Sequence, residues 1–207
     1  MARRPVGRDS RLQVFRAAAA EFAERGYEAA GVDRIAGRAR VNKAMIYYHF
    51  GSKRALYLEV LRDMFRAVAA RARALADGPG TPEEKVDAWI VAIVEEASAR
   101  PWFPPIMLRE LASGVPHVDA DTMALLQAVV GAVRDMIVQG QQDGGFRDVD
   151  PLLAHLTIMP PIMVFFVHEG VVRKRTRGLP GPFASPKSRD EFITHMQQAV
   201  RGMLRKD

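Results

Sequence analysis

The 207-residue sequence predicts an all-α protein of about nine helices, with a three-helix N-terminal head and a C-terminal helical bundle. Apolar residues recur at spacings of three and four along most of the chain, and no stretch alternates as a strand does. The gaps between these periodic stretches hold helix caps, glycine and proline. We therefore expect a helix-turn-helix domain over residues 1–51 and a ligand-binding and dimerisation domain over residues 52–207.

The overall composition is that of an ordinary globular protein. It is 48% hydrophobic and 26% charged, and no apolar run reaches the roughly 18 residues of a membrane span. The N-terminus lacks the apolar stretch of a secretory signal, and the absence of cysteine suits a reducing compartment. We expect a cytoplasmic protein without a membrane partner, and the sequence indicates no cofactor and no metal ion.

Positive charge is concentrated at one end of the chain. Residues 1–60 contain 12 Lys and Arg against 6 Asp and Glu, whereas the other 147 residues carry 18 of each. Arg3, Arg4 and Arg8 precede the first helical pattern and suggest a basic arm. This segregation is expected if the N-terminal segment binds a polyanion such as DNA, although a solvated charged surface gives the same count.

Three short helices are expected in the head, over residues 10–25, 32–38 and 42–50. Gly26 is placed to end the first helix, and Asn42 can cap the third. Three short helices joined by tight turns make a helix-turn-helix unit.

The third helix has two distinct faces. Ile46 and Phe50 lie on the side expected to face inward, which leaves Lys43, Tyr47 and Tyr48 facing outward. An outward face of this kind can present donors to the phosphates and base edges of DNA.

The body is expected to contain six helices, over residues 52–77, 81–100, 105–113, 119–141, 152–167 and 189–205. Thr81 to Glu84 form a capping box with proline at the first helical position. The segment 152–167 is apolar on nearly all sides and contains Pro160 and Pro161, so we expect it to be buried between the core of its own chain and a second chain. A Pro/Gly-rich loop is expected over residues 173–187.

About twenty positions between Phe15 and Leu56 follow a fixed pattern. They are Phe15, Ala18, Phe22, Gly26-Tyr27, Val32, Ile35-Ala36, Ala39, Val41 and the run Ile46-Tyr47-Tyr48-His49-Phe50-Gly51-Ser52-Lys53-Arg54-Ala55-Leu56. The pattern resembles the TetR (TetR/AcrR) family of transcriptional regulators and covers about a quarter of the chain.

The resemblance implies double-stranded operator DNA as a partner. By this resemblance Tyr47, His49 and Lys53 hold phosphates, while Asn42 and Lys43 at the start of the third helix read bases. Tyr48 either touches a thymine methyl group or a sugar, or packs on the helix surface. A lone histidine such as His49 is also commonly structural.

Three positions depart from the family pattern. Met45 stands where a small hydroxyl residue usually donates to a phosphate, which methionine cannot do. Arg40 replaces the usual turn glycine, where a left-handed backbone costs roughly 1 kcal/mol, and it either reaches a phosphate or is an exposed surface residue. Gly31 replaces the usual Ser or Thr cap, a loss of a few tenths of a kcal/mol.

The resemblance also implies a homodimer and a small-molecule effector. The last two long helices would form a four-helix interface with the partner chain, including Phe192, Met196, Ala199 and Met203. An apolar or amphiphilic effector would lie among large, adaptable side chains of the body, with polar anchors at Arg109, Glu110 or His168. The predicted effector set is Phe65, Trp89, Trp102, Phe103, Met107, Arg109, Met159, Met163 and His168.

Two other classes of function have some support in the sequence. An enzyme would have to use His117, His155, His168 or His195, but no catalytic motif accompanies them and no catalytic residues are assigned. A helical ligand-binding protein without DNA function leaves the basic head unexplained. The sequence therefore favours a DNA-binding transcriptional regulator, and the resemblance to the family favours a repressor over an activator.

Overall fold

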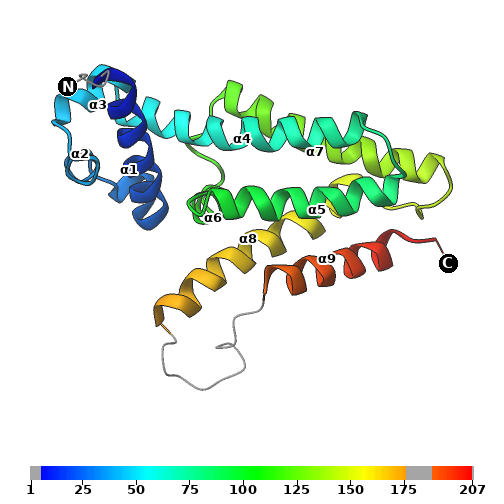
Figure 1. Ribbon diagram of the computed structural model, residues 1–207. Coiled ribbons are helices and arrows are strands. Elements are labelled where there is room, and N and C mark those ends of the chain that lie inside the picture. The colour runs from blue at the N-terminus through cyan, green and yellow to red at the C-terminus, as the bar shows by residue number, and fades with distance from the viewer. Residues whose placement is uncertain (1–5, 176–187, 207) are drawn as a thin grey trace, which may run out of the picture.

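The computed structural model describes residues 6–175 and 188–206, and within these ranges the chain forms nine α-helices. The predicted all-α architecture is confirmed. Helices α1 to α3 make a head at one end of an elongated molecule (Figure 1). The other six helices form the body, in which α4 and α7 lie on one side of α5, and α8 and α9 lie on the other.

The head consists of α1 (Val6–Ala29), α2 (Val32–Ala39) and α3 (Lys43–Phe50). Helix α1 begins before the predicted residue 10, so Arg8 lies inside a helix rather than in a basic arm. Arg3 and Arg4 lie outside the described residues. The three helices bury a shared apolar core that includes Val14, Ala18, Phe22, Ile35 and Ile46.

Gly26 was predicted to end the first helix. It breaks the helical backbone there, but helical residues resume after it and continue to Ala29. Its backbone takes φ 77° and ψ 172°, a left-handed conformation that costs a residue with a Cβ atom more than it costs glycine. One further helical turn follows to Ala29. Tyr27 and Glu28 therefore form a corner of the head, which lies close to the body.

Among the described helices, α4 (Lys53–Asp77) and α7 (Ala120–Gln142) contact each other most extensively. Ser52 caps α4 by accepting from the backbone N–H of Ala55 at 3.0 Å. At about 1.5 Å per residue, the 25 residues of α4 extend close to 40 Å. The helix contacts α1 and α3 in the head as well as α5 and α7 in the body.

Helices α5 (Pro82–Ala99) and α6 (Phe103–Ala112) follow in the chain. The predicted capping box is present in α5, where Thr81 and Glu84 satisfy each other's backbone N–H groups. Helix α6 starts two residues earlier than predicted, because Pro104 lies in its first turn, where proline is tolerated.

Helix α8 (Pro151–Arg175) differs most from expectation. It runs through Pro160 and Pro161 and continues eight residues beyond the predicted end at Val167. Buried side chains around the prolines, Ile158 and Ile162 among them, hold this stretch against the core and offset the backbone hydrogen bonds that proline removes. The predicted loop therefore begins after Arg175, and residues 176–187 lie outside the described part of the chain.

One face of α8 is exposed in the single chain, where the sequence predicted burial between the core of the same chain and a second chain. Its apolar members include Leu152, Leu153, Leu156 and Val164, and the last is 54% exposed. The last helix, α9 (Arg189–Leu204), packs against α5 and α8. Within residues 6–175 and 188–206, nothing in the chain covers this apolar stripe along α8.

Two body helices, Ala120–Gln142 and Pro151–Gly170, are long and apolar enough to pass a membrane-span test based on length and composition. The sequence-based expectation that no such stretch exists was therefore too strict. Helix α7 packs on α4 and α5, and α8 packs on α6 and α7, as core helices of a soluble protein do. These two helices do not indicate a membrane protein.

Candidate nucleic-acid interface

The turn between α2 and α3 sets the orientation of the third helix. Arg40 adopts φ 55° and ψ 41°, the left-handed conformation considered from the sequence. The N–H groups of Arg40 and Val41 donate to the carbonyls of Gly37 and Ala36, which closes the end of α2. Asn42 then caps α3 by accepting from the N–H of Ala44 at 2.9 Å. Asn42 therefore has a structural role whether or not it also touches DNA.

The outward face of α3 is as the sequence predicted. Ile46 is fully buried, whereas Tyr47 is 46% and Tyr48 is 79% exposed. Lys43 is also exposed at the N-terminal end of the helix. An exposed helix face bearing an amine and two phenols provides donors for base edges and phosphates.

Lys43 forms an ion pair that the sequence analysis did not include. Its Nζ atom lies 2.9 Å from Oδ1 and 3.1 Å from Oδ2 of Asp33, in the first turn of α2. The hydrogen bond to Asp33, and then the negative charge of Asp33, raise the pKa of Lys43 above its usual value. The ammonium group therefore stays protonated, and its ion pair joins the start of α3 to the start of α2.

His49 and Lys53, both predicted to bind phosphate, have partners within the protein. His49 Nε2 lies 2.8 Å from Ser10 Oγ, which ties α3 to α1. Lys53 Nζ donates to the carbonyl of Glu28 at 3.2 Å and lies 4.4 Å from the ring centroid of Tyr27. An ammonium group has three donors, so Lys53 keeps hydrogens for an additional acceptor.

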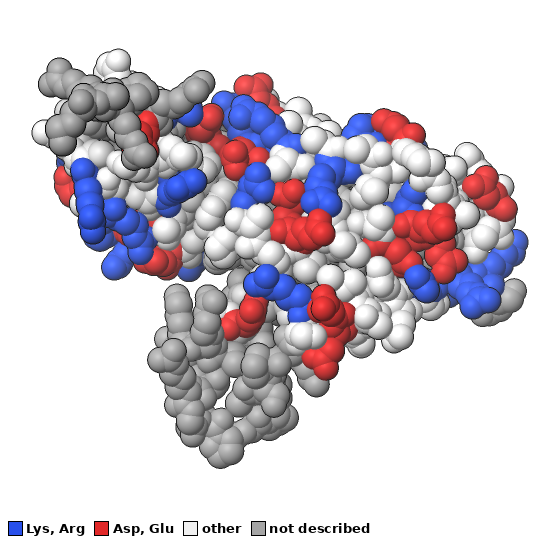
Figure 2. Space-filling view, in the orientation of Figure 1, with Lys and Arg blue, Asp and Glu red and all other residues white. Residues whose placement is uncertain are grey.

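A basic groove on the head was missed by the sequence analysis. It encloses about 400 Å³ between α1 and α2, and it is lined by Gln13, Arg16, Ala17, Arg38, Ala39 and Arg40. Arg38 is paired with Glu24 at 2.7 Å, whereas Arg16 and Arg40 have no ion-pair partner among the described residues. Figure 2 shows Lys and Arg gathered over the head on its visible face. The periodicity of α1 could have identified Arg16, which lies on its exposed face.

A buried polar cluster connects the head to the body. Glu110 of α6 is only 3% exposed and accepts a 2.6 Å hydrogen bond from the hydroxyl of Tyr57 in α4. His117 Nδ1 lies 2.8 Å from the same carboxylate, and His117 Nε2 lies 3.4 Å from Glu28 in the head. Burial, and then the hydrogen bond to Glu110, raise the pKa of Tyr57, so its hydroxyl keeps the proton that it donates.

Arg109, the neighbour of Glu110, also faces the head. Its guanidinium group donates to the carbonyls of Ala23 and Glu24 near the end of α1. Arg109 and Glu110 were predicted as polar anchors for an effector, but in this structure both side chains are engaged in the contact between α6, α4 and α1. They therefore connect the body to the head.

The other residues of the predicted effector set lie at different depths. Phe65, Trp89, Phe103, Met107 and Met163 are buried, Trp102 and Met159 are half-buried, and His168 is exposed. Trp89 Nε1 and His155 Nδ1 are buried without a hydrogen-bond partner among the described residues. Since buried polar atoms are normally satisfied, these two nitrogens are exceptions that the described part of the chain leaves without a partner.

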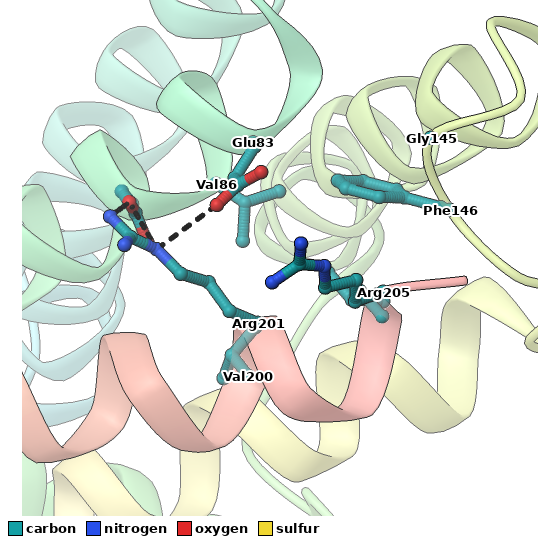
Figure 3. A pocket seen from close by; sticks show the side chains of 9 residues that line it. Glu83, Val86, Gly145, Phe146, Val200, Arg201 and Arg205 are labelled. Carbon is teal, nitrogen blue, oxygen red and sulfur yellow. Dashed lines mark hydrogen bonds and ion pairs between the residues drawn. The ribbon is translucent and has the colours of Figure 1, made fainter. Parts of the chain in front are cut away.

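A small cavity of about 120 Å³ (Figure 3) lies between the start of α5 and the end of α9, at the end of the body away from the head (Figure 1). It contains none of the predicted effector residues. Its lining comes from α5, the loop before α8 and the end of α9: Glu83, Val86, Asp87, Gly145, Phe146, Val200, Arg201, Leu204 and Arg205. Arg201 pairs there with Glu83 at 3.3 Å and with Asp87.

The predicted dimer residues of α9 lie on one face of the helix but differ in their exposure. Met196 is 5% exposed and packs into the core of its own chain, so it offers almost no surface to a partner. Ala199 is exposed, and Phe192 and Met203 are half-buried. The assignment of Met196 to a dimer interface is therefore corrected, because its own chain already covers it.

This fold, with an exposed helix-turn-helix end and a basic groove beside it, defines a DNA-binding protein with an all-helical body. Residues 14–60 match the family model described as bacterial regulatory proteins, tetR family. The chain is 32% identical over 146 residues to the HTH-type transcriptional repressor SCO4008 of Streptomyces coelicolor, covering 69% of this chain and 70% of the repressor. It is 26% identical over 199 residues to the HTH-type transcriptional repressor NicS of Pseudomonas putida, covering 95% and 93% of the two chains.

Among solved structures, the ketosteroid transcriptional regulator KstR2 of Mycobacterium tuberculosis is similar over 95% of both chains, with a TM-score of 0.72 and 26% identity. The chain belongs to the TetR family of transcriptional regulators, as the resemblance indicated. It is a DNA-binding regulator, its relatives are not enzymes, and members of the family are typically dimers that bind small molecules.

Proposed function

We propose that the protein is a homodimeric repressor that binds a palindromic operator and is released by a small apolar or amphiphilic effector. The observation that carries the proposal is the exposed outward face of α3, which bears Lys43, Tyr47 and Tyr48. It is accompanied by the groove containing Arg16 and Arg40, which have no ion-pair partner in the described part of the chain. Positive charge and donors are thereby combined on one end of the head.

Different residues would contact different parts of the DNA. Lys43, at the end of α3, would read a base edge, because lysine donates to guanine O6 and N7 in the major groove. Tyr47, Lys53 and Arg40 would donate to phosphates. His49 would act mainly by holding α3 against Ser10, which leaves one ring nitrogen for a phosphate.

The exposed apolar stripe of α8 supports a two-fold dimer. Leu152, Leu153, Leu156 and Val164 follow one another at spacings of one, three and eight residues and are all exposed on α8, so a second copy of α8 could cover them together. A two-fold dimer places two heads on half-sites one or more helical turns apart, which predicts a palindromic operator. Ala199, Phe192 and Met203 of α9 can contribute at the edge of the same interface.

The effector would bind in the apolar interior of the body. Trp89 Nε1 and His155 Nδ1 would supply hydrogen bonds to an otherwise apolar molecule, and Phe103, Met107 and Met163 would surround it. Relatives include a ketosteroid regulator, so steroid-like compounds belong among the probes. Any shift of α6 would reach the head through Arg109 and Glu110, since both face α1 or α4.

The proposed division of labour places DNA reading in residues 1–51, with Lys53 just beyond them at the start of α4, and ligand binding and dimerisation in residues 52–207. A regulator of this kind works in the cytoplasm, where its operator is. Its release from DNA requires that the effector bind more tightly to the conformation whose two heads are wrongly spaced.

An electrophoretic shift with the DNA upstream of the gene tests DNA binding, with random DNA of equal length for comparison. Lys53→Ala should weaken binding to both DNAs and lower the slope of log affinity against log salt by about one per lost phosphate contact. Lys206→Ala is the control, because Lys206 is exposed at the far end of the body. Equal affinities and slopes for all three proteins would remove Lys53 from the interface.

Sedimentation tests the dimer. Val164→Glu places a charge on the exposed stripe of α8 and should give folded monomers, whereas Ala70→Glu on exposed α4 should leave the dimer intact. A Val164→Glu protein that remains dimeric at low micromolar concentration would refute this interface.

A titration tests the effector. Apolar, cationic and acidic small molecules are added to the protein–operator complex while tryptophan emission and operator release are followed together. Apolar or amphiphilic compounds should produce both signals. If only small, highly polar metabolites do so, the apolar pocket is wrong.

A further inference from the structure

Asp33 and Lys43 bring opposite charges together at the tip of the head. Asp33 lies in the first turn of α2, and Lys43 is the first residue of α3. Their carboxylate and ammonium groups are 2.9 Å apart, and the side chains are 82% and 46% exposed. An exposed ion pair of this kind contributes little to folding stability, so its position at the outward end of the reading helix calls for another explanation.

We propose that Asp33 and Lys43 act together to read one G·C base pair in each half-site, which makes Asp33 a specificity-determining residue. The inference rests on the proposed DNA-binding function and extends it. Lys43 would donate to guanine, and Asp33 would accept from the amino group of the paired cytosine.

The spacing of the two groups matches that of the two bases. In a G·C pair, guanine O6 accepts a hydrogen bond from cytosine N4, so these two atoms are about 2.9 Å apart. Both atoms also face the major groove, where O6 still accepts and N4 still donates. The Nζ to Oδ1 distance of 2.9 Å presents a donor beside an acceptor at the same separation. The ion pair and the base pair can therefore form a closed ring of four hydrogen-bonding groups.

The order of the groups discriminates among the four base pairs. On the guanine side the ammonium group meets two acceptors, O6 and N7, and on the cytosine side the carboxylate meets a single donor. A reversed C·G pair or an A·T pair places an amino group against the ammonium of Lys43. A T·A pair offers an acceptor and a donor in the right order, but it sets a methyl group beside Lys43 and the adenine N7 acceptor beside Asp33. The expected preference is G·C, then T·A, then the other two.

The carboxylate also explains why a lysine can be selective here. A free lysine has a flexible stem and would pair with any nearby phosphate. Asp33 fixes the ammonium in one place before DNA arrives, and its own charge is repelled by phosphates. Binding is then favoured only where a base donor satisfies the carboxylate, which lowers affinity for unrelated DNA and raises the contrast between sites.

Selection of bound sequences from a randomised double-stranded library tests the proposal. Three proteins are compared: the wild type, Asp33→Ala and the control Asp135→Ala. Asp135 is matched to Asp33 because it is an exposed aspartate paired with an exposed arginine, Arg73, at 2.8 Å, but it lies on α7 in the body. Thermal melting of each protein confirms that all three are folded.

The wild type and Asp135→Ala should select the same two-fold motif. Asp33→Ala should select that motif with the preference for G·C lost at one position per half-site, about 10- to 100-fold, and should bind random DNA more tightly. If Asp33→Ala selects the wild-type base at every position with unchanged contrast, the proposed role of Asp33 is wrong while DNA binding stands. If the wild type selects no motif at all, the proposed function itself fails.

Discussion

The buried hydrogen bond between Tyr57 and Glu110 gives a sharp prediction for Tyr57→Phe, which removes one oxygen atom and little else. Tyr57 is 2% and Glu110 is 3% exposed, and the hydroxyl lies 2.6 Å from the carboxylate. A hydrogen bond to a charged group contributes about 1.5–3 kcal/mol, with the upper part of that range expected for buried partners. Glu110 keeps the ring of His117 at 2.8 Å, so part of its hydrogen bonding survives. We expect a loss of about 2 kcal/mol in the free energy of unfolding.

Urea unfolding at one fixed protein concentration measures this loss, because the stability of a dimer depends on concentration. Tyr48→Phe is the control, since Tyr48 is 79% exposed, and its change should stay within about 0.5 kcal/mol. In a Glu110→Gln background the lost hydrogen bond is neutral, and Tyr57→Phe should then cost only about 1 kcal/mol. Equal midpoints for Tyr57→Phe and wild type would show that the buried contact contributes nothing.

Further predictions concern other parts of the fold. Gly140→Ala should destabilise the protein by about 1–3 kcal/mol, because a Cβ atom there would lie 2.2 Å from the ring of Phe146. Gly131→Ala on the same helix is the control: its Cβ atom meets no atom within 4 Å, so it should stabilise the protein by up to about 1 kcal/mol. Urea midpoints of the two variants that move in the same direction would contradict this. Burial lowers the pKa of His155, so the unfolded chain takes up the proton first and stability should fall as pH drops below about 6.5. Unfolding curves at pH 7.5 and 5.5 should show a smaller pH effect in His155→Gln, and an unchanged effect would exclude His155 as the cause. Arg40→Gly should raise the melting temperature, because glycine relieves a left-handed backbone that costs roughly 1 kcal/mol; a lower melting temperature would count against strain at this position.

Local patterns were sufficient to predict much of the head. The inward position of Ile46, the cap at Asn42 and the outward Tyr47 and Tyr48 all follow from helical periodicity and side-chain chemistry within a few residues. The capping box at Thr81 is equally local. Such features depend on residues that are close together in the sequence, so they can be predicted from the sequence alone.

Other features depend on contacts between distant segments, which a single sequence does not contain. Arg109 donates to a carbonyl 86 residues away, so its place beside α1 could not be read from its own surroundings. The stripe of α9 showed that Met196 is buried, but not whether its own chain or a partner buries it. Helix α8 passes through Pro160 and Pro161 because packing on the core overrides local propensity.

Helix α4 has a consequence for anyone who wishes to exchange the heads of related regulators. Its first turns bury Leu56, Tyr57 and Val60, and the helix contacts α1 and α3 there before it runs along α7 in the body. A junction placed at residue 51 would give the incoming head a supporting helix selected for a different head. Chimeras should instead be joined within α4 beyond Val60. Arg109 and His117, which contact the head from the body, should be transferred together with the head.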